Sequence, residues 1–376
     1  MAVQIKLQHY NMKKQVLISG ASIAGLSLAY WLNRYGYEVS IVEMSAGLRR
    51  GGSPVDVRGE ALNVVKEMGI LEKIRDKKFV HTDEIVNAQN ETLITFDINA
   101  QAEYLGDIEI HRDDLVDILY ENIPANEMEF LFINSIEELS EHDDNVEVVF
   151  KNGGKRNFDF VFGADGTHST VRKLVFGREE QYSRFFGAYF AFVKAADIQP
   201  NNPNAGVMYR EPGKMAMIYP FKNEVNAGVV FRSPKLSYDY KDHAQHKQIL
   251  KDNFKDGSWK IPDILDVMLH SDDLYFDEVC QIHMPSWTKG HVALVGDAAH
   301  TTGFPTGMGT SLAIQGAALL AKELRTNEDF NMSFAKYNEM YRPYVESVQT
   351  RIVRGLDWLV PETEEGIQES VNRFKK

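Results

Sequence analysis

Hydrophobic and polar positions follow two different patterns along this chain. Short apolar runs alternate with amphipathic segments of helix length up to about residue 180 and again after about residue 284, whereas period-two alternation dominates between these points. Apolar strands separated by amphipathic helices are typical of a parallel sheet covered by helices, and period-two alternation is typical of antiparallel strands. The pattern therefore predicts an α/β fold with a separate β-rich insertion and C-terminal helices.

The same patterns predict individual elements. Strands are expected at 16–18, 38–42, 158–162, 188–192, 207–210, 215–221, 227–232 and 292–295. Helices are expected at 23–35, 61–74, 113–122, 243–254, 263–270, 309–325, 331–349 and 363–374.

The first glycine motif, Gly20-Ala21-Ser22-Ile23-Ala24-Gly25, follows a strand and opens a helix, and the next strand ends in Glu43. Strand, glycine turn, helix, strand and acid in this order form the fingerprint of a dinucleotide-binding Rossmann unit. Gly20 is expected in the tight turn, and Gly25 where the helix packs on the sheet. The pyrophosphate is expected at the helix N-terminus, and the Glu43 carboxylate on the ribose hydroxyls. Ser22 replaces the middle glycine, and its hydroxyl could donate to the ligand.

A second glycine motif runs from Gly163 to Arg172 after the strand at 158–162, and it contains Asp165. Taken alone, this motif can also be a polar turn from strand to helix, with Ser169 as an ordinary helix cap.

A third motif begins where the apolar strand at 292–295 ends in Gly296-Asp297. Gly303, Gly307 and Gly309 follow, and then a helix rich in Ala and Leu. A strand, a carboxylate and a glycine loop that opens a helix can present backbone N–H groups to an anionic or polyhydroxylated ligand.

The three motifs, in this order, resemble those of the class A flavoprotein monooxygenases, the group of para-hydroxybenzoate hydroxylase and the tetracycline-inactivating monooxygenases. The resemblance runs from about residue 14 to the C-terminal helices. It implies a Rossmann-like FAD-binding domain with an inserted β-sheet substrate domain. In such a protein the first motif binds the ADP half of FAD. The motif with Asp165 lies near both FAD and the nicotinamide nucleotide, and Asp297 holds the ribityl chain and pyrophosphate.

The resemblance also implies a role for Arg112, which matches the family arginine that opens a helix and reaches the phosphate and ribityl region. Its alternative is a solvated residue in the first turn of a helix. Gly307 and Met308 lie in the loop expected beside the isoalloxazine ring. The chain departs from the family at Ser22, at Met308, which replaces a polar residue, and at Pro305, which comes one place late. These departures bear on the isoalloxazine contacts rather than on FAD binding.

A basic, glycine-rich loop follows the second strand at 49–59. Glycines and arginines there suggest a segment that crosses the cofactor, with Arg50 offsetting phosphate charge and Arg58 as a weaker candidate. The alternative is a solvated basic turn.

The predicted activity follows from the resemblance. We expect an FAD-dependent monooxygenase that uses NADPH or NADH and O2 to hydroxylate a small aromatic or polycyclic substrate through a flavin C4a-hydroperoxide. A tetracycline-like antibiotic is one candidate substrate. The flavin does the chemistry, so no catalytic side chain is expected, and the chain has no Gly-x-Ser-x-Gly elbow. The alternatives are a flavoprotein reductase, a halogenase or a flavin-binding protein without turnover. Of the Trp-x-Trp-x-Ile-Pro signature of flavin halogenases, only the end is present, as Trp259-Lys260-Ile261-Pro262.

Residues that could contact the substrate lie in the β-rich part, although each has an ordinary structural explanation. Aromatic and Met side chains suit a planar or hydrophobic substrate but also suit core packing: Tyr189, Phe190, Met215, Met217 and Tyr219. Polar side chains that could orient a substrate, or could be surface or satisfied residues, are Arg210, Asn226, Arg232 and His283. His300 is expected to give structural support.

Composition restricts the partners. The 376 residues carry a formal net charge of −13, which argues against nucleic acid and anionic membranes. The single cysteine, Cys280, excludes an internal disulfide, and the scattered His residues show no zinc-ligand spacing. No apolar run approaches the length of about 18 residues that a membrane span needs. We expect a cytoplasmic monomer or homodimer without metal, nucleic-acid or membrane partners.

The expected domain organisation is discontinuous. Residues 12–180 and 284–350 form the two parts of the FAD-binding domain, 181–283 the β-rich substrate domain, and 351–376 a C-terminal helix. Residues 1–11 are polar and lack the apolar core of a secretory signal. We expect them to be an upstream extension or vector-derived, and their removal to change stability by less than about 0.5 kcal/mol.

Overall fold

The computed structural model describes residues 13–96, 106–124, 127–198, 202, 204–221 and 224–372. Segment 1–11, expected to be dispensable, lies outside these residues. The fold is the predicted mixture of α and β structure with C-terminal helices. None of the described helices is both long enough and apolar enough to cross a membrane.

A six-stranded sheet forms the centre of the first part of the molecule. Its order is β17-β18-β11-β1-β2-β7, and all pairs are parallel except β17 with β18. The strands are β1 (Gln15–Ser19), β2 (Glu38–Val42), β7 (Met128–Leu131), β11 (Phe160–Gly163), β17 (Thr288–Lys289) and β18 (Val292–Leu294). Because β1, β11 and β18 are parallel neighbours, the three predicted motifs all start at the same edge of this sheet.

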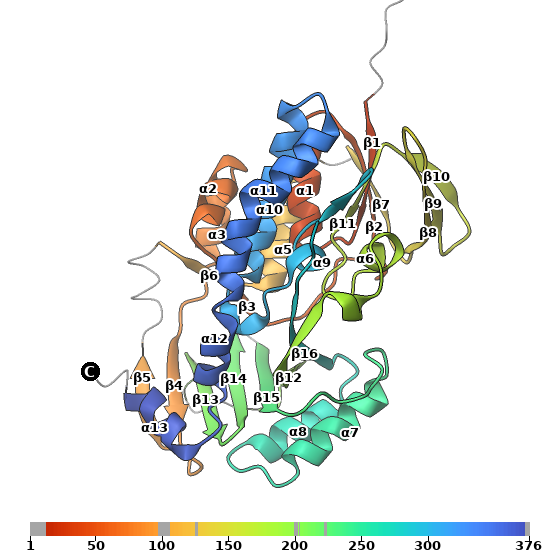
Figure 1. Ribbon diagram of the computed structural model, residues 1–376. Coiled ribbons are helices and arrows are strands. Elements are labelled where there is room, and N and C mark those ends of the chain that lie inside the picture. The colour runs from red at the N-terminus through yellow and green to blue at the C-terminus, as the bar shows by residue number, and fades with distance from the viewer. Residues whose placement is uncertain are drawn as a thin grey trace, which may run out of the picture.

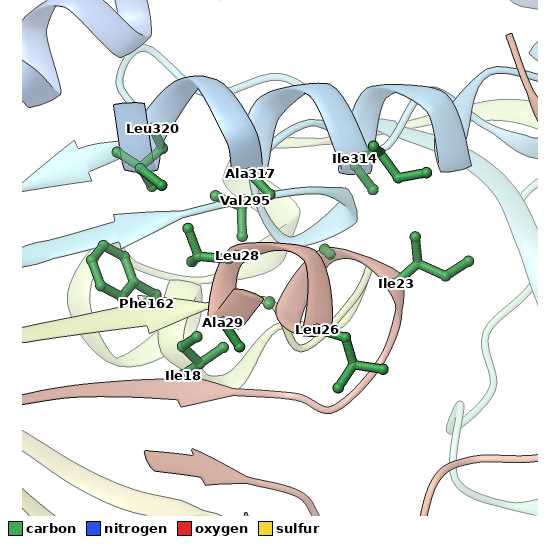
Figure 2. Packing of buried hydrophobic residues seen from close by; sticks show 14 of the residues in the cluster. Ile18, Ile23, Leu26, Leu28, Ala29, Phe162, Val295, Ile314, Ala317 and Leu320 are labelled. Atoms are coloured by element: carbon green, nitrogen blue, oxygen red, sulfur yellow. The ribbon is translucent and has the colours of Figure 1, made fainter. Parts of the chain in front are cut away.

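Helices cover this sheet, and two of them open at the motifs. Helices α1 (Ile23–Arg34) and α10 (Gly309–Thr326) pack on each other. Figure 2 shows Leu28 of α1, Ala317 of α10 and Val295 in one buried core. The other helices of this part are α2 (Glu60–Glu67), α3 (Leu71–Asp76), α5 (Arg112–Glu121), α6 (Thr170–Val175), α9 (Asp297–His300) and α11 (Phe330–Gln349).

A seven-stranded sheet forms the second part (Figure 1). Its order is β16-β12-β15-β14-β13-β4-β5, and its pairs are antiparallel except β13 with β4. The strands are β4 (Thr82–Val86), β5 (Thr92–Phe96), β12 (Ser183–Lys194), β13 (Ala205–Glu211), β14 (Lys214–Phe221), β15 (Glu224–Arg232) and β16 (Tyr275–Ile282).

The two faces of this sheet have different neighbours. One face packs on α7 (His243–Phe254) and α8 (Ile261–His270). The other face packs on α12 (Ile352–Leu359), α13 (Glu364–Asn372) and Phe304 in η2 (Phe304–Thr306). Since η2 belongs to the loop of the third motif, the second face lies toward the first part of the molecule.

Smaller elements complete the described structure. A three-stranded sheet contains β8 (Ile136–Glu141), β9 (Val146–Phe150) and β10 (Lys155–Phe158). A two-stranded ribbon pairs β3 (Pro54–Val57) with β6 (Ile108–His111), and η1 (Glu179–Gln181) is a short 3-10 turn.

Two helical predictions differ from the structure. The helix expected at 61–74 is two helices, α2 and α3, because Gly69 adopts a positive φ of 76° and ends the first. The single C-terminal helix expected at 351–376 is two helices, α12 and α13, and the first of them buries Ile352 and Leu356 against the seven-stranded sheet.

The strand pairing bears on the proposed division into domains. Strands β4 and β5 join the seven-stranded sheet, although the proposed boundaries assign residues 12–180 to the FAD-binding domain. We keep that division as a proposal, with 82–96 added to the substrate domain.

Candidate functional site

Gly20 and Gly25 bring the start of α1 close to β1 and β11. The N–H of Gly20 donates to the carbonyl of Val42 at 2.8 Å, and Gly20 has a φ of 105°. A Cβ on Gly25 would lie 1.9 Å from the Gly20 carbonyl oxygen, and one on Gly20 would lie 2.5 Å from that of Ala164. Only glycine fits at these two positions, as the fingerprint requires.

Glu43 lies at the end of β2, against the same turn. Its Oε2 accepts from the N–H of Ala21, and its Oε1 accepts from the N–H of Ser45, each at 2.9 Å. The carboxylate therefore also ties the glycine turn to the second strand, in addition to the ribose role expected for it.

Ser22 and Arg112 meet at the N-terminus of α1. Arg112 Nη2 donates to Ser22 Oγ at 2.9 Å, and Nη1 donates to the carbonyls of Arg49 at 3.0 Å and Gly51 at 3.3 Å. Burial, and secondarily the charge of Arg49, lowers the pKa of Arg112 from its ordinary value. The Arg112 side chain is only 16% exposed, so it is not the solvated first-turn residue that the sequence left as an alternative.

Arg50 and Arg58 have different surroundings. Arg50 is exposed and pairs with Asp117 on α5 at 2.7 Å, which matches the alternative that the loop at 49–59 is a solvated basic turn. Arg58 pairs with Asp56 at 3.0 Å and lies within 3.6 Å of Asp107. Its Nη1 would be 3.0 Å from a Cβ on Gly307, so Arg58 rather than Arg50 borders the third motif.

Asp165 organises the start of α6. Its carboxylate accepts from Ser169 Oγ at 2.5 Å and from the N–H of Val171 at 3.1 Å, while Ser169 Oγ accepts from the N–H of Arg172 at 3.0 Å. Burial raises the pKa of Asp165 above its ordinary value, although these hydrogen bonds oppose the shift. These contacts are those of an ordinary helix cap, with Ser169 capping α6 and Asp165 holding Ser169.

Asp297 lies at the start of α9 and is open to solvent. The surface of Asp297 is accessible, but neighbouring protein atoms reduce the hydration of its carboxylate, and this desolvation, together with the charge of Asp277, raises its pKa to about 6, against the opposing effect of Arg172. A Cβ on Gly309, the first residue of α10, would lie 3.8 Å from Asp297 Oδ1. The carboxylate is therefore beside the N-terminus of α10.

The N-termini of α1 and α10 share a property. Neither Ser22 before α1 nor Met308 before α10 makes a side-chain capping hydrogen bond. Free backbone N–H groups and the helix dipole make such helix starts favourable for phosphate or other anions.

Gly307 and Met308 contribute to the third motif in different ways. Gly307 has a φ of 63°, which gives the loop its turn into α10. The Met308 side chain is buried in the core of the first part, so only its backbone is available to a ligand.

The sheet face toward the third motif is aromatic. The rings of Phe190 and Phe192 on β12 lie 4.6 and 6.3 Å from that of Phe304, between ring centroids. Met215, Met217 and Tyr219 belong to the same cluster, whereas Tyr189 is in the core with α7 and α8.

The four polar residues that could orient a substrate are hydrogen-bonded within the protein or buried in it. Arg232 ties β15 to α12 through Asp357 at 2.6 Å, and His283 contacts Gln281 at 2.9 Å. Arg210 donates to Ser370 of α13 at 2.7 Å, and Asn226 is buried on β15.

His300 is buried between the rings of Trp287 and Tyr341. Burial lowers the pKa of His300 to about 4, so the ring is neutral at neutral pH. This environment suits a packing role.

Sequence reasoning missed a charged network beside Asp297. It contains His168 and Glu179 from the first part and Tyr275 and Asp277 from β16. Asp277 lies more than a hundred positions after the second motif, so no local spacing relates it to His168. Among the described residues, no group of three or more His, Cys, Asp or Glu could hold a metal ion.

The fold and these three motifs define a flavin-binding oxidoreductase of the α/β class. Residues 13–331 match the family described as FAD binding domain, and the chain belongs to this family. It is 38% identical over 340 residues to a flavin-dependent monooxygenase from an unknown prokaryotic organism, covering 89% of this chain and 88% of that protein.

Solved structures agree with this assignment. The crystal structure of tetracycline destructase Tet(51) has a TM-score of 0.85 and 34% identity, covering 96% of this chain and 95% of its own. Tet(55) has a TM-score of 0.85 and 35% identity, covering 96% and 94%. The protein is an FAD-dependent monooxygenase, similar in structure to the tetracycline destructases.

Proposed function

We propose that the protein uses NADPH or NADH and O2 to hydroxylate a small aromatic or polycyclic molecule, with a flavin C4a-hydroperoxide as the oxygen donor. The observation that carries this proposal is the aromatic face formed by Phe190, Phe192 and Phe304, next to the loop that follows Asp297. An apolar surface beside the flavin loop can hold a planar substrate and exclude water.

The residues present fit the cofactor. Two helix starts without side-chain caps suit the pyrophosphate, and Arg112 brings a buried positive charge to one of them. The open carboxylate of Asp297 suits ribityl hydroxyls, and Glu43 suits the adenosine ribose. FAD would supply the redox chemistry, while these side chains bind and orient it.

A tetracycline is the first substrate to test. The support is the similarity to Tet(51) and Tet(55), at 34% and 35% identity. Phenols form the second group, because they share a planar, electron-rich ring. We also propose a cytoplasmic location, where NAD(P)H is available and the buried Cys280 stays reduced.

The test is NADPH and NADH oxidation by FAD-loaded protein under ¹⁸O₂, with a panel of tetracyclines and phenols. A substrate should accelerate oxidation and gain one labelled oxygen atom, and Asp297→Asn should reduce both effects by lowering flavin occupancy. Turnover that continues unchanged without O2, or product oxygen drawn from labelled water, would favour the reductase alternative and overturn the proposal.

A further inference from the structure

A histidine of the second glycine motif connects the FAD-binding part to the substrate sheet. His168 Nδ1 lies 2.9 Å from Glu179 Oε1, and Nε2 lies 3.2 Å from Asp277 Oδ1. Glu179 follows α6, whereas Asp277 is on β16 of the seven-stranded sheet. Each ring nitrogen thus faces a carboxylate, and only the imidazolium form has an N–H for both.

The two carboxylates favour the charged form of the His168 ring. Burial disfavours the charged form, but the hydrogen bonds to Asp277 and Glu179 outweigh burial and raise the pKa of His168 to about 10. The Tyr240 ring stacks on the imidazole at a centroid distance of 4.4 Å, which limits its rotation. The contact is therefore an ion pair on both sides throughout the neutral pH range.

Glu179 continues the connection toward the flavin loop. Its Oε2 accepts from Arg172 Nη2 at 2.6 Å, and Arg172 Nη1 donates to the carbonyl of Ala298 at 2.9 Å. Ala298 follows Asp297 directly in the chain. His168 is therefore two side chains away from the backbone that carries the third motif.

Asp277 continues the connection toward the substrate sheet. Its Oδ2 accepts from the Tyr275 hydroxyl at 3.0 Å, and the guanidinium of Arg49 lies over the Tyr275 ring at 5.0 Å. Asp277 is also the register partner of Phe190 on β12, whose ring contacts Phe304. The carboxylate that His168 contacts is thus next to the aromatic face proposed for the substrate.

We propose that His168 is a positioning residue that holds Asp277 and Tyr275, and with them the aromatic sheet face, in a fixed position over the flavin-binding loops. The inference rests on the proposed function, because it concerns the alignment between flavin and substrate. The proposed role needs no direct contact of His168 with flavin or substrate. His168 acts through Asp277 on one side and through Glu179 and Arg172 on the other.

The expected consequence is a loss of coupling. Misplacement of a substrate by about 1 Å can slow a transfer step by about a hundredfold. Without hydroxylation, NAD(P)H, a proton and O2 would still be converted to NAD(P)⁺ and H2O2, so the cofactor would be consumed without product. His168→Gln should therefore lower product formed per NAD(P)H consumed by about threefold to tenfold, a ratio that does not depend on the rate of NAD(P)H oxidation itself.

The coupling experiment has a matched control. His291 also pairs with a carboxylate, Glu141 at 3.1 Å, but within the first part of the molecule. His291→Gln should keep the coupling of the parent protein, and Asp277→Asn should reproduce the loss in His168→Gln. Parent-like coupling in both His168→Gln and Asp277→Asn would overturn the proposal, and so would an equal loss in His291→Gln.

A measurement without turnover separates this inference from the proposed function. Hydrogen–deuterium exchange of FAD-loaded protein should be faster in 163–170 and in β16 for His168→Gln, and unchanged there for His291→Gln. Nitrogen-15 NMR of labelled histidines should show His168 as an imidazolium at pH 8. A neutral ring at pH 8, or exchange that does not change in either segment, would overturn the positioning role even if the protein turns over no tested substrate.

Discussion

Ser22 Oγ accepts a hydrogen bond from Arg112 Nη2 at 2.9 Å, although 90 positions separate the two residues in the sequence. Serine stands here at the middle glycine position of the dinucleotide fingerprint. Its hydroxyl gives the arginine an anchor at the start of α1, where the pyrophosphate is expected. The serine that departs from the usual fingerprint therefore has a structural role, because its hydroxyl holds Arg112 at the start of α1.

Removing this anchor should weaken FAD binding. In Ser22→Ala the arginine keeps the carbonyls of Arg49 and Gly51 but loses its contact to α1. The dissociation constant for FAD should rise by about threefold to tenfold, less than a full hydrogen bond to a charged group would give, because the lost bond acts on FAD only through the position of Arg112. Flavin fluorescence titration measures this, with Ser347→Ala on α11 as the control. An unchanged constant would mean that Arg112 is held equally well without Ser22.

Gly25→Ala should destabilise the protein. The new Cβ would lie 1.9 Å from the Gly20 carbonyl oxygen, so the turn or the helix must move. We expect a loss of about 1–3 kcal/mol in the free energy of unfolding and reduced flavin content. Gly47→Ala is the matched control, because a Cβ at Gly47 meets no heavy atom within 4 Å. Urea unfolding of both variants checks the prediction, and equal stabilities would contradict it.

Glu43→Ala should weaken FAD and leave FMN almost unaffected. FMN lacks the adenosine ribose that the carboxylate is expected to contact, and the variant also loses the bonds to Ala21 and Ser45. The FAD dissociation constant should rise by about tenfold or more. Titration with both flavins, with the exposed Glu67→Ala as control, measures the difference. A parent protein that binds FMN as tightly as FAD would refute the assignment.

FAD affinity should depend on pH through Asp297. Its pKa is raised to about 6, and the charged carboxylate is the form that accepts hydrogen bonds from ribityl hydroxyls. Below pH 6 protonation competes with binding, so the affinity should fall by up to about tenfold per pH unit, and above pH 6 it should be constant. Asp297→Asn should bind FAD weakly and without this step. Titrations from pH 5 to pH 8 test this, and a parent curve without the step would exclude the role.

Stability should depend on pH through His168. Because its pKa in the folded protein is about 10, against an ordinary value of 6.5, the contribution of the ion pairs is complete below pH 6.5. It is lost progressively as the pH rises to about 10. The difference in unfolding free energy between the parent and His168→Gln should therefore shrink from pH 6.5 to pH 10. Urea unfolding at several pH values measures it, and a difference independent of pH would contradict the ion pairs.

The sequence by itself determined the α/β class, most helices and strands, and the three motifs that mark the site. These features are local. The period of apolar residues reports which face of an element is buried, and glycine at Gly20 or Gly307 reports a backbone that other residues rarely adopt. A strand followed by a glycine turn and a helix is recognisable without any knowledge of distant contacts.

The tertiary structure decided which distant residues meet. It paired β4 with β13, placed α12 over the sheet, buried the Met308 side chain and brought Asp277 to His168. The tertiary structure also pairs Arg50 with Asp117 and places Arg58 beside Gly307 of the third motif. Such pairings depend on the packing of whole elements against one another. Many partners of equal charge and polarity are available along the chain, and only the closed fold selects among them.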